Sequence, residues 1–269
     1  MQLRLALLLL PLTACLDEAP PETAEDTAAV SGYGEWSWSG DIVANPAKLW
    51  SVGSNVCFLS GISGDFTGST STPAEADVSL QTFPPDPLLY WTLGSKIGTG
   101  TGTEAWGSCI PLSGNSGTYL QTGSTTSWAG TTKSQCYLQI VTNAGGLSTS
   151  TAKASVTHAL SGSTLTWHLT TTTNVKALAI CFENPTFTSR TTVALTPPVA
   201  GTTYFDLHNA AGADISTSGT VCGLTEISGN WQTSAPHGWD DGVVAHSYGL
   251  ADWQGSTSAQ RAGVAECLK

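Results

Sequence analysis

The chain has 269 residues, of which only 11% are charged, and its formal net charge is −11. Charged residues make up about 25% of an average soluble protein, whereas Ser, Thr and Gly fill that share here. The excess of negative charge argues against binding to nucleic acid or to anionic lipid headgroups. Such a composition is typical of an extracellular β protein with a surface rich in hydroxyl groups.

The N-terminal residues predict an export signal. Arg4 precedes an apolar run that is shorter than the roughly 20 residues of a bilayer-spanning helix but has the length of a signal-peptide core. The run ends in Leu12-Thr13-Ala14-Cys15, which resembles the lipobox of bacterial lipoproteins. The resemblance implies that residues 1–14 are removed and that Cys15 is lipidated, so that acyl chains attach the protein to a membrane. The alternative is an ordinary secretory signal in which the cysteine has no role.

The residues after Cys15 predict a location and a tether. Leu16 stands where an Asp would retain an enterobacterial lipoprotein in the inner membrane, so the resemblance implies the outer membrane or cell surface. Residues 15–30 contain acids, Pro, Ala and Thr but no aromatic residue, which predicts a disordered tether. From Ser31 the composition changes, and residues 35–39 alternate apolar and polar side chains as a strand does.

One stretch of sequence occurs three times. Cys57-Phe-Leu-Ser-Gly-Ile-Ser-Gly-Asp-Phe66 returns as Cys222-Gly-Leu-Thr-Glu-Ile-Ser-Gly-Asn-Trp231, and a looser copy starts at Cys136. Each copy continues through a Trp to a closing cysteine. The seventh residue after each opening cysteine is Gly or Asn, and these residue types tolerate positive φ, which predicts a turn or bulge there.

The cysteines predict three disulfides. With Cys15 set aside, six cysteines remain in a compartment that permits their oxidation. The spans from opening to closing cysteine are similar in the three copies, so pairing within each copy is expected. The expected bridges are Cys57–Cys109, Cys136–Cys181 and Cys222–Cys267. On the chain-entropy model each bridge would contribute about 4 kcal/mol to stability.

The periodicity predicts an all-β fold with about four strands in each copy. A second strand is expected around Val78, Val156 and Val244, and a third around Trp91, Trp167 and Trp253. A last strand ends at the closing cysteine, and the small residues two and four positions before it predict a bulky neighbour, for which the repeated Trp is the candidate.

The three β units are expected at residues 31–120, 121–205 and 206–269, either as tandem modules or as one pseudo-threefold domain. Their Cys-x-Leu start, inner Trp and cysteine end resemble a cysteine-bounded β module of secreted bacterial proteins. That resemblance implies no particular activity.

Motifs for catalysis or cofactor binding are absent or lack their context. There is no Gly-x-Ser-x-Gly elbow, and residues 150–153 match Ser-x-x-Lys only where a strand or loop is expected. His158 and His246 stand where the first copy has Leu80, which favours a packing role over a catalytic one. No cofactor is therefore expected.

The last copy contains one polar cluster of interest, His237-Gly-Trp239-Asp240-Asp241, with His246 nearby. Its histidines and carboxylates are potential metal ligands, His237, Asp240 and His246 above all. Adjacent carboxylates on a strand point to opposite faces, however, and no fixed ligand spacing accompanies them, so a solvated loop is the favoured interpretation.

Ten tryptophans raise the question of carbohydrate binding, because an exposed indole can stack on a sugar ring. Trp239 beside His237 and Asp240 suits that role, and Asp241 and Trp231 are further candidates. The opposing interpretation, that these tryptophans fill the core, is favoured for the set as a whole.

Three functions stay open. The leading hypothesis is a non-enzymatic cell-surface binding or adhesion protein, with carbohydrate as the first ligand to test. The second is a purely structural envelope protein that acts through protein–protein contacts. The third is a hydrolase or metal-dependent enzyme centred on His237–His246. Binding predicts an exposed Trp in a concave patch, and an enzyme predicts that His237, Asp240 and His246 converge.

Overall fold

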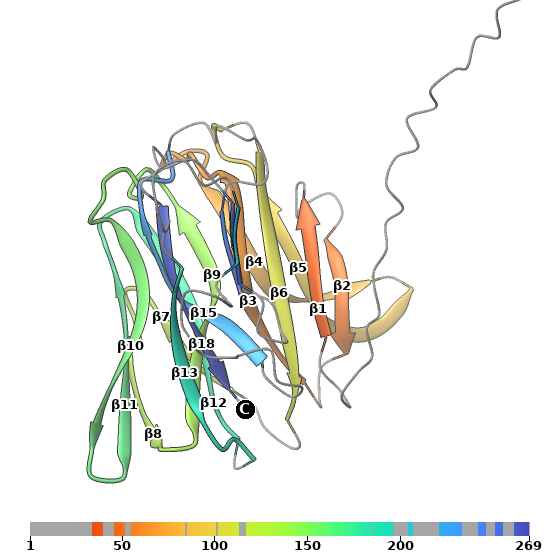
Figure 1. Cartoon of the computed structure of the whole chain (residues 1–269). Coiled ribbons are helices and arrows are strands. Elements are labelled where there is room, and N and C mark those ends of the chain that lie inside the picture. Colours follow the sequence, from red (N-terminus) through yellow and green to blue (C-terminus); the bar gives the residue numbers. More distant parts are fainter. Residues whose placement is uncertain are drawn as a thin grey trace, which may run out of the picture.

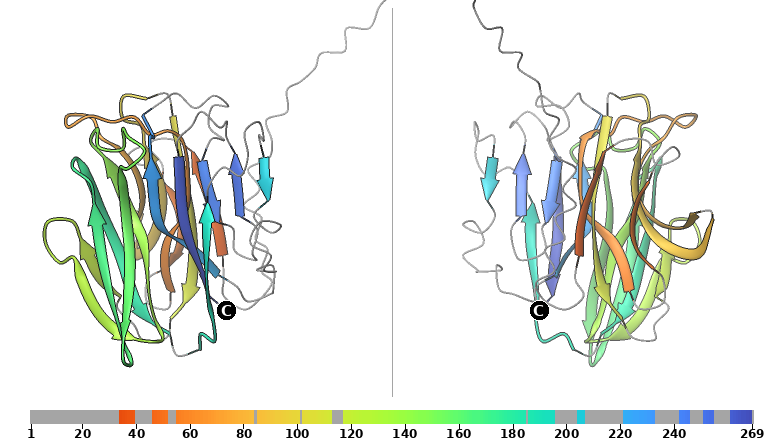
Figure 2. Two further views of the ribbon diagram at one scale, coloured as in Figure 1. Left: turned by 60° about the vertical axis from the view of Figure 1, so that its left-hand side comes forward. Right: turned by 90° about the vertical axis from the view of Figure 1, so that its right-hand side faces the viewer.

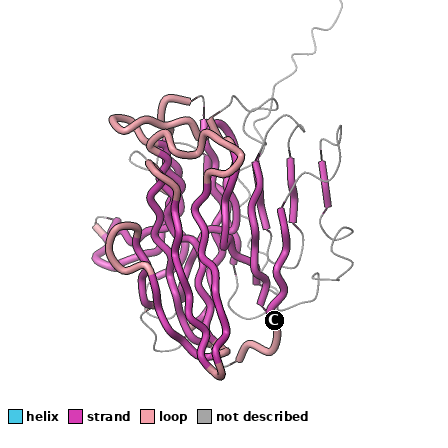
Figure 3. The backbone as a smooth tube through the Cα atoms, turned by 90° about the vertical axis from the view of Figure 1, so that its left-hand side faces the viewer, coloured by secondary structure: helices cyan, strands magenta, loops and turns pink. Residues whose placement is uncertain are grey.

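The computed structural model describes residues 34–39, 46–51, 55–83, 85–100, 102–112, 117–184, 186–195, 204–206, 221–232, 242–245, 251–254 and 261–268. Within these ranges the regular structure consists of strands, without a helix, and loops join the strands at their ends (Figure 3). The expected all-β fold is confirmed.

The described strands fall into three groups of six, one group for each copy of the repeat. The first group is β1 (Gly34–Ser39), β2 (Ala47–Ser51), β3 (Asn55–Asp65), β4 (Ala74–Phe83), β5 (Asp86–Lys96) and β6 (Gly102–Pro111). The second is β7 (Thr118–Gln121), β8 (Ser127–Thr131), β9 (Ser134–Asn143), β10 (Lys153–Ser161), β11 (Thr164–Thr171) and β12 (Val175–Glu183). The third is β13 (Arg190–Leu195), β14 (Tyr204–Asp206), β15 (Val221–Gly229), β16 (Gly242–Ala245), β17 (Ala251–Gln254) and β18 (Arg261–Leu268).

The three copies exchange hairpins. The sheets have the strand orders β1-β6-β3-β16-β17-β14, β2-β5-β4-β9-β12-β7 and β13-β18-β15-β10-β11-β8. In each sheet the two cysteine-bearing strands of one copy pair with the middle hairpin of another copy. The first hairpin joins the second copy, the second joins the third, and the third joins the first. Figures 1 and 2 show the resulting single body, so the copies form one pseudo-threefold domain and not tandem modules.

Each copy is closed by its own disulfide. The bridges are Cys57–Cys109, Cys136–Cys181 and Cys222–Cys267, with sequence separations of 52, 45 and 45 residues. The two cysteines of each bridge are direct partners across a strand pair, with Cα atoms 4.0 Å apart. The pairing expected from the matching spans is confirmed.

The three opening strands meet at the centre of the domain. β3, β9 and β15 contact one another pairwise, and the residue after each opening cysteine points to this centre. The rings of Phe58 and Tyr137 lie 4.2 Å apart between centroids. The third copy has Gly223 at this place, and a Cβ there would lie 2.6 Å from Tyr137 and 2.7 Å from Phe58. Two aromatic rings therefore fill a site that three side chains could not share.

Of the turn or bulge expected at the seventh residue, the second copy has the turn: β9 ends at Asn143, whose Oδ1 accepts hydrogen bonds from the amides of Gly145 and Leu147 at 3.1 and 3.0 Å. The bulges lie three residues after the opening cysteines. The register shifts at Ser60, Gln139 and Thr225, each of which is buried. Gly64 and Gly229 have positive φ, 84° and 99°, which glycine adopts without strain. Pairing continues past Gly64 to Asp65, whereas β15 ends at Gly229.

The repeated Trp is a structural element in the first two copies. Trp91 and Trp167 are buried, and the Nε1–H of each donates a hydrogen bond to the residue two positions before an opening cysteine. Trp91 donates to the Asn55 carbonyl at 3.0 Å, and Trp167 donates to the Ser134 hydroxyl at 2.8 Å. The expected core role is confirmed for these two.

The third hairpin is not a strict copy of the other two. Trp91 pairs with Leu80 and Trp167 with His158, whereas Trp253 pairs with Val243. His246 therefore does not occupy the position opposite the Trp that Leu80 and His158 occupy in the other copies, although counting along the sequence predicts it there. At the small residue Gly107, the side-chain atoms nearest to an added Cβ belong to Leu93 and Val78, at 3.3 and 3.5 Å, and not to the repeated Trp.

Candidate functional site

Most of the sequence-predicted site residues lie outside the described residues. These are Cys15, His237, Trp239, Asp240, Asp241 and His246. Trp231 is described and is fully buried, with its ring edge-to-face against Phe66 at 6.5 Å and 5.1 Å from the guanidinium carbon of Arg261. Its Nε1–H donates to the Ser228 carbonyl at 2.9 Å. Trp231 thus offers no open face to a sugar ring.

The described part of the chain contains no group of three or more His, Cys, Asp or Glu side chains that could hold a metal ion. Over the same residues, no helix has the length and apolar character needed to cross a membrane.

A buried carboxylate organises a polar network between the second and third copies. Glu266 on β18 has a side chain only 7% exposed. It accepts a hydrogen bond from Gln135 Nε2 at 2.7 Å and lies 3.1 Å from His158 Nε2 and 3.4 Å from Arg190 Nε. These groups come from β9, β10 and β13. Because a buried carboxylate is costly unless it is paired, this convergence of donors offsets the burial of the Glu266 side chain.

The network fixes the Arg190 guanidinium. Its Nε donates to Gln135 Oε1 at 2.8 Å, and its Nη2 donates to the Ser134 carbonyl. The guanidinium carbon lies 5.3 Å from the centre of the Trp167 ring, which also contacts His158 at 4.5 Å between ring centroids. Stacking on Trp167 and the hydrogen bonds together hold the guanidinium in one orientation.

Tyr137 connects the network to the central core. Its hydroxyl donates to the Glu266 carbonyl at 2.9 Å. Burial raises the pKa of the Tyr137 phenol well above its usual value, and the Glu266 charge raises it further while the Arg190 charge opposes both. The phenol therefore remains a neutral hydrogen-bond donor.

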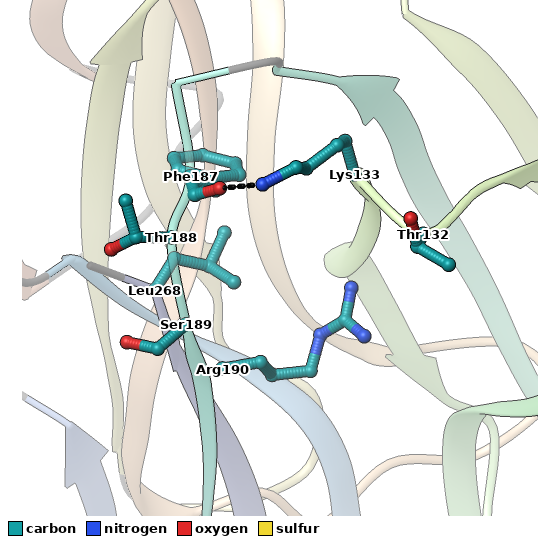
Figure 4. A pocket seen from close by; sticks show the side chains of 7 residues that line it. All are labelled: Thr132, Lys133, Phe187, Thr188, Ser189, Arg190 and Leu268. Atoms are coloured by element: carbon teal, nitrogen blue, oxygen red, sulfur yellow. Dashed lines mark hydrogen bonds between the residues drawn. The ribbon is translucent and has the colours of Figure 1, made fainter.

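A pocket of about 110 Å³ lies beside Arg190 (Figure 4). It is bounded by the turn between β8 and β9, by the segment that leads into β13 and by the end of β18. Its lining residues are Thr132, Lys133, Phe187, Thr188, Ser189, Arg190 and Leu268. Lys133 Nζ donates to the Phe187 carbonyl across the pocket, and the Arg190 guanidinium and Leu268 lie on its other sides.

Asn184 holds the segment that forms one wall of the pocket. Its Oδ1 accepts hydrogen bonds from the Thr186 amide at 3.0 Å and the Thr186 hydroxyl at 2.6 Å. The Asn184 amide in turn donates to the Lys133 carbonyl at 3.1 Å, which joins the two walls. Such a side chain to backbone turn is the usual way in which Asn fixes a loop. The pocket is therefore built on fixed backbone.

The pocket combines three kinds of group: two cationic side chains, a hydroxyl from Thr132 and the apolar surfaces of Phe187 and Leu268. This set suits the binding of a small polar molecule that has one apolar face. Sequence reasoning missed Lys133 and Arg190. The available signal was their scarcity, since Lys and Arg together number only nine in the chain.

The fold and site define a disulfide-bridged, pseudo-threefold β domain with a small cationic pocket between its second and third copies. Comparison with known proteins gives no match to a family model, to a curated protein or to a solved structure. The proposed function therefore rests on the chemistry of the pocket and on the N-terminal sequence.

Proposed function

We propose that the protein is a non-enzymatic binding protein of the bacterial cell envelope. It is attached to the membrane by lipid on Cys15, with the outer membrane or cell surface as its location, and it binds a saccharide in the pocket formed by Lys133, Phe187, Arg190 and their neighbours. The lipobox at residues 12–15 and the acidic, Pro-rich tether that follows support the location.

The chemistry of the pocket carries the binding proposal. Sugar rings present hydroxyl groups around their rim and C–H groups on their faces. Arg190 and Lys133 can donate hydrogen bonds to ring oxygens, and Phe187 and Leu268 supply buried apolar surface, being 7% and 2% exposed. A cavity of about 110 Å³ is smaller than the engineered cavities of roughly 150 Å³ that hold one benzene ring, so the pocket admits one edge of a sugar unit and the rest of that unit stays in solvent.

The scaffold supports a binding role over a catalytic one. The groups around the pocket are held by hydrogen bonds to Gln135, Ser134 and Asn184, and no serine or cysteine nucleophile with an adjacent base is among the pocket residues. A rigid arrangement of donors lowers the entropy lost on binding.

A glycan array tests the proposal. The purified, oxidised protein is applied to an array that includes cell-wall and exopolysaccharide fragments, beside two variants, Lys133→Ala and Trp239→Ala. Specific binding that is lost in Lys133→Ala and kept in Trp239→Ala supports the pocket. Loss of binding in Trp239→Ala alone would place the ligand in the last copy. Carbohydrate binding would then stand, but the assignment of the binding site to the pocket would be overturned.

A clean negative result with folded protein would overturn the carbohydrate proposal. The structural alternative, an envelope protein that works through protein contacts, would then be preferred. Leu88 and Leu89, 55% and 39% exposed at the start of β5, are the apolar side chains that such a contact would cover first.

The lipid anchor has an independent test. Mass spectrometry of the N-terminal peptide from membranes of expressing cells should find an acylated Cys15, and Cys15→Ala should release the protein from the membrane fraction. An unmodified N-terminus elsewhere in the sequence would show that the signal is an ordinary secretory one.

A further inference from the structure

We propose that the pocket selects a negatively charged sugar unit, a ring that carries a carboxylate, over a neutral one. This inference rests on the proposed saccharide-binding function and narrows its ligand class. It starts from the charges around the pocket, which differ in sign from the protein as a whole.

The pocket gathers positive charge in an acidic protein. The chain has nine Lys and Arg against twenty Asp and Glu, yet both charged residues among the seven that line the pocket are basic. A cationic recess on an otherwise anionic surface focuses the field on small anions. Neutral saccharides need no such charge, since hydroxyl and amide groups suffice for them.

The Arg190 charge is paired with Glu266 at 3.4 Å, outside the pocket lining, so Lys133 supplies the charge that no acid of the lining opposes. Glu266 lies behind Arg190 and shares its carboxylate with Gln135 and His158. Glu183 Oε1 accepts a hydrogen bond from the Thr131 amide at 2.9 Å. Neither acid lines the pocket, so an incoming carboxylate would meet Lys133 and Arg190 first.

Arg190 is presented in a form that suits a carboxylate. Two of its nitrogens are engaged by Gln135 and Ser134, and its central carbon lies over the Trp167 ring at 5.3 Å from the ring centroid. A guanidinium held in this way does not lose rotamer freedom when it binds an anion. Lys133 adds a second charge from the opposite wall, where its Nζ already reaches the Phe187 carbonyl.

The apolar lining decides between a sugar acid and a simple anion. Leu268 and Phe187, 2% and 7% exposed, present a small apolar edge to the pocket beside the cations, and this edge would contact one side of a bound sugar ring while the carboxylate lies between Lys133 and Arg190. A free anion such as acetate would leave that apolar surface unused. The sugar acid should therefore bind more tightly than acetate at the same salt concentration.

Isothermal titration of the full-length protein tests the inference with three probes: methyl glucuronide, methyl glucoside and acetate. The glucuronide should bind at least tenfold more tightly than the other two, and its affinity should fall as salt is raised. Lys133→Gln should weaken glucuronide binding about tenfold, and Lys133→Arg should retain it.

Lys153→Gln is the matched control, because it removes the same charge from a Lys that pairs with Glu226 at 3.8 Å and does not line the pocket. It should leave glucuronide binding unchanged. Equal loss in Lys153→Gln would mean that net charge alone matters and would overturn the inference. Thermal unfolding of each variant checks that the fold is intact.

The outcomes separate this inference from the proposed function. Equal binding of glucuronide and glucoside, unaffected by Lys133→Gln, would leave saccharide binding in place and overturn the selection for charge. Binding of acetate as tight as that of glucuronide would overturn the role of the ring. Absence of binding by both sugars here, together with a negative glycan array, would overturn both proposals.

Discussion

The surroundings of Trp91 and Trp167 show how one scaffold position acquires different chemistry in two copies. Both indoles are buried, and both donate a hydrogen bond to the residue two places before an opening cysteine. The residue opposite Trp91 is Leu80, which is 37% exposed. The residue opposite Trp167 is His158, which reaches Glu266.

The difference comes from the partners supplied by the third copy. Arg190 stacks near Trp167, and Glu266 pairs with both Arg190 and His158. The residues that precede the closing cysteine in the other copies are Ser108 and Ile180, which cannot form such a network. The scaffold thus repeats its Trp for stability, and the junction between the second and third copies carries a charged network beside a pocket.

The largest effect is expected for Glu266→Ala. Removal of the carboxylate leaves Arg190 and Gln135 without their buried partner, and breaking a buried pair costs about 3–5 kcal/mol. Chemical denaturation should show this loss in the free energy of unfolding. The matched change in the first copy, Ser108→Ala, should cost about 1 kcal/mol. Similar losses in the two variants would mean that the network adds nothing to the scaffold.

The first copy has a buried acid of its own, Asp77, at a place where the second copy has Ser155. Asp77 and Ser155 pair with the fourth residue after an opening cysteine, and among the described residues Asp77 Oδ1 and Ser155 Oγ have no hydrogen-bond partner. Burial raises the pKa of Asp77 to about 6, the hydrogen bond to Ser79 lowers it, and the nearby Glu75 charge raises it.

Asp77 should therefore make the first copy sensitive to pH. Its contribution to stability is present below the pKa of the unfolded state, about 4, and is lost as the pH rises to about 6, because the unfolded chain ionises first. Asp77→Asn should stabilise the protein at pH 7 by about 1–3 kcal/mol and not at pH 3.5. Urea denaturation at both values measures this. A gain that is equal at the two pH values would contradict the assignment.

Paired Trp→Phe variants sharpen the comparison. Both lose an indole hydrogen bond, which costs about 1 kcal/mol. Trp167→Phe also weakens the stacking of Arg190, which adds roughly 0.5–1 kcal/mol. Trp167→Phe should therefore be the more destabilising of the two in denaturant titrations. The reverse order would show that Arg190 is held by its hydrogen bonds alone.

The smallest effect is expected when the second copy is made like the first. His158→Leu introduces the residue that the first copy has at this place and removes one partner of Glu266, while Arg190 and Gln135 remain. Because the His158 side chain is 28% exposed, the cost should stay below about 1 kcal/mol. A loss as large as that of Glu266→Ala would give His158 the central place in the network.

The polar network could not have been predicted from the sequence. Gln135 and Glu266 are 131 residues apart, and His158 and Glu266 are 108 apart. The repeat identified His158 as a packing position, and its ring does pack on Trp167. Its contact with Glu266 forms only because β10 pairs with β15 of another copy. No local periodicity carries that information.

The repeat predicts correctly that its tryptophans are buried in the first two copies. Trp91 and Trp167 recur and are buried, as expected. Trp231 was proposed as a ligand residue from its polar neighbours in sequence, but it packs against Phe66 and Arg261 inside the fold. Residue type shows that an indole needs a partner for its N–H group, and only the packing shows whether its face is open.

The sequence alone determined the strands and the disulfides. β-Strand residue types and turn signals predict about four of the six strands described in each copy, and matched cysteine spans in three similar copies predict each bridge, since both depend on order along the chain. The tertiary structure alone decided which sheet each hairpin joins and which side chains surround Arg190. The physical reason is that backbone hydrogen bonds between strands do not depend on residue type, so the sequence of a hairpin does not name the copy that accepts it.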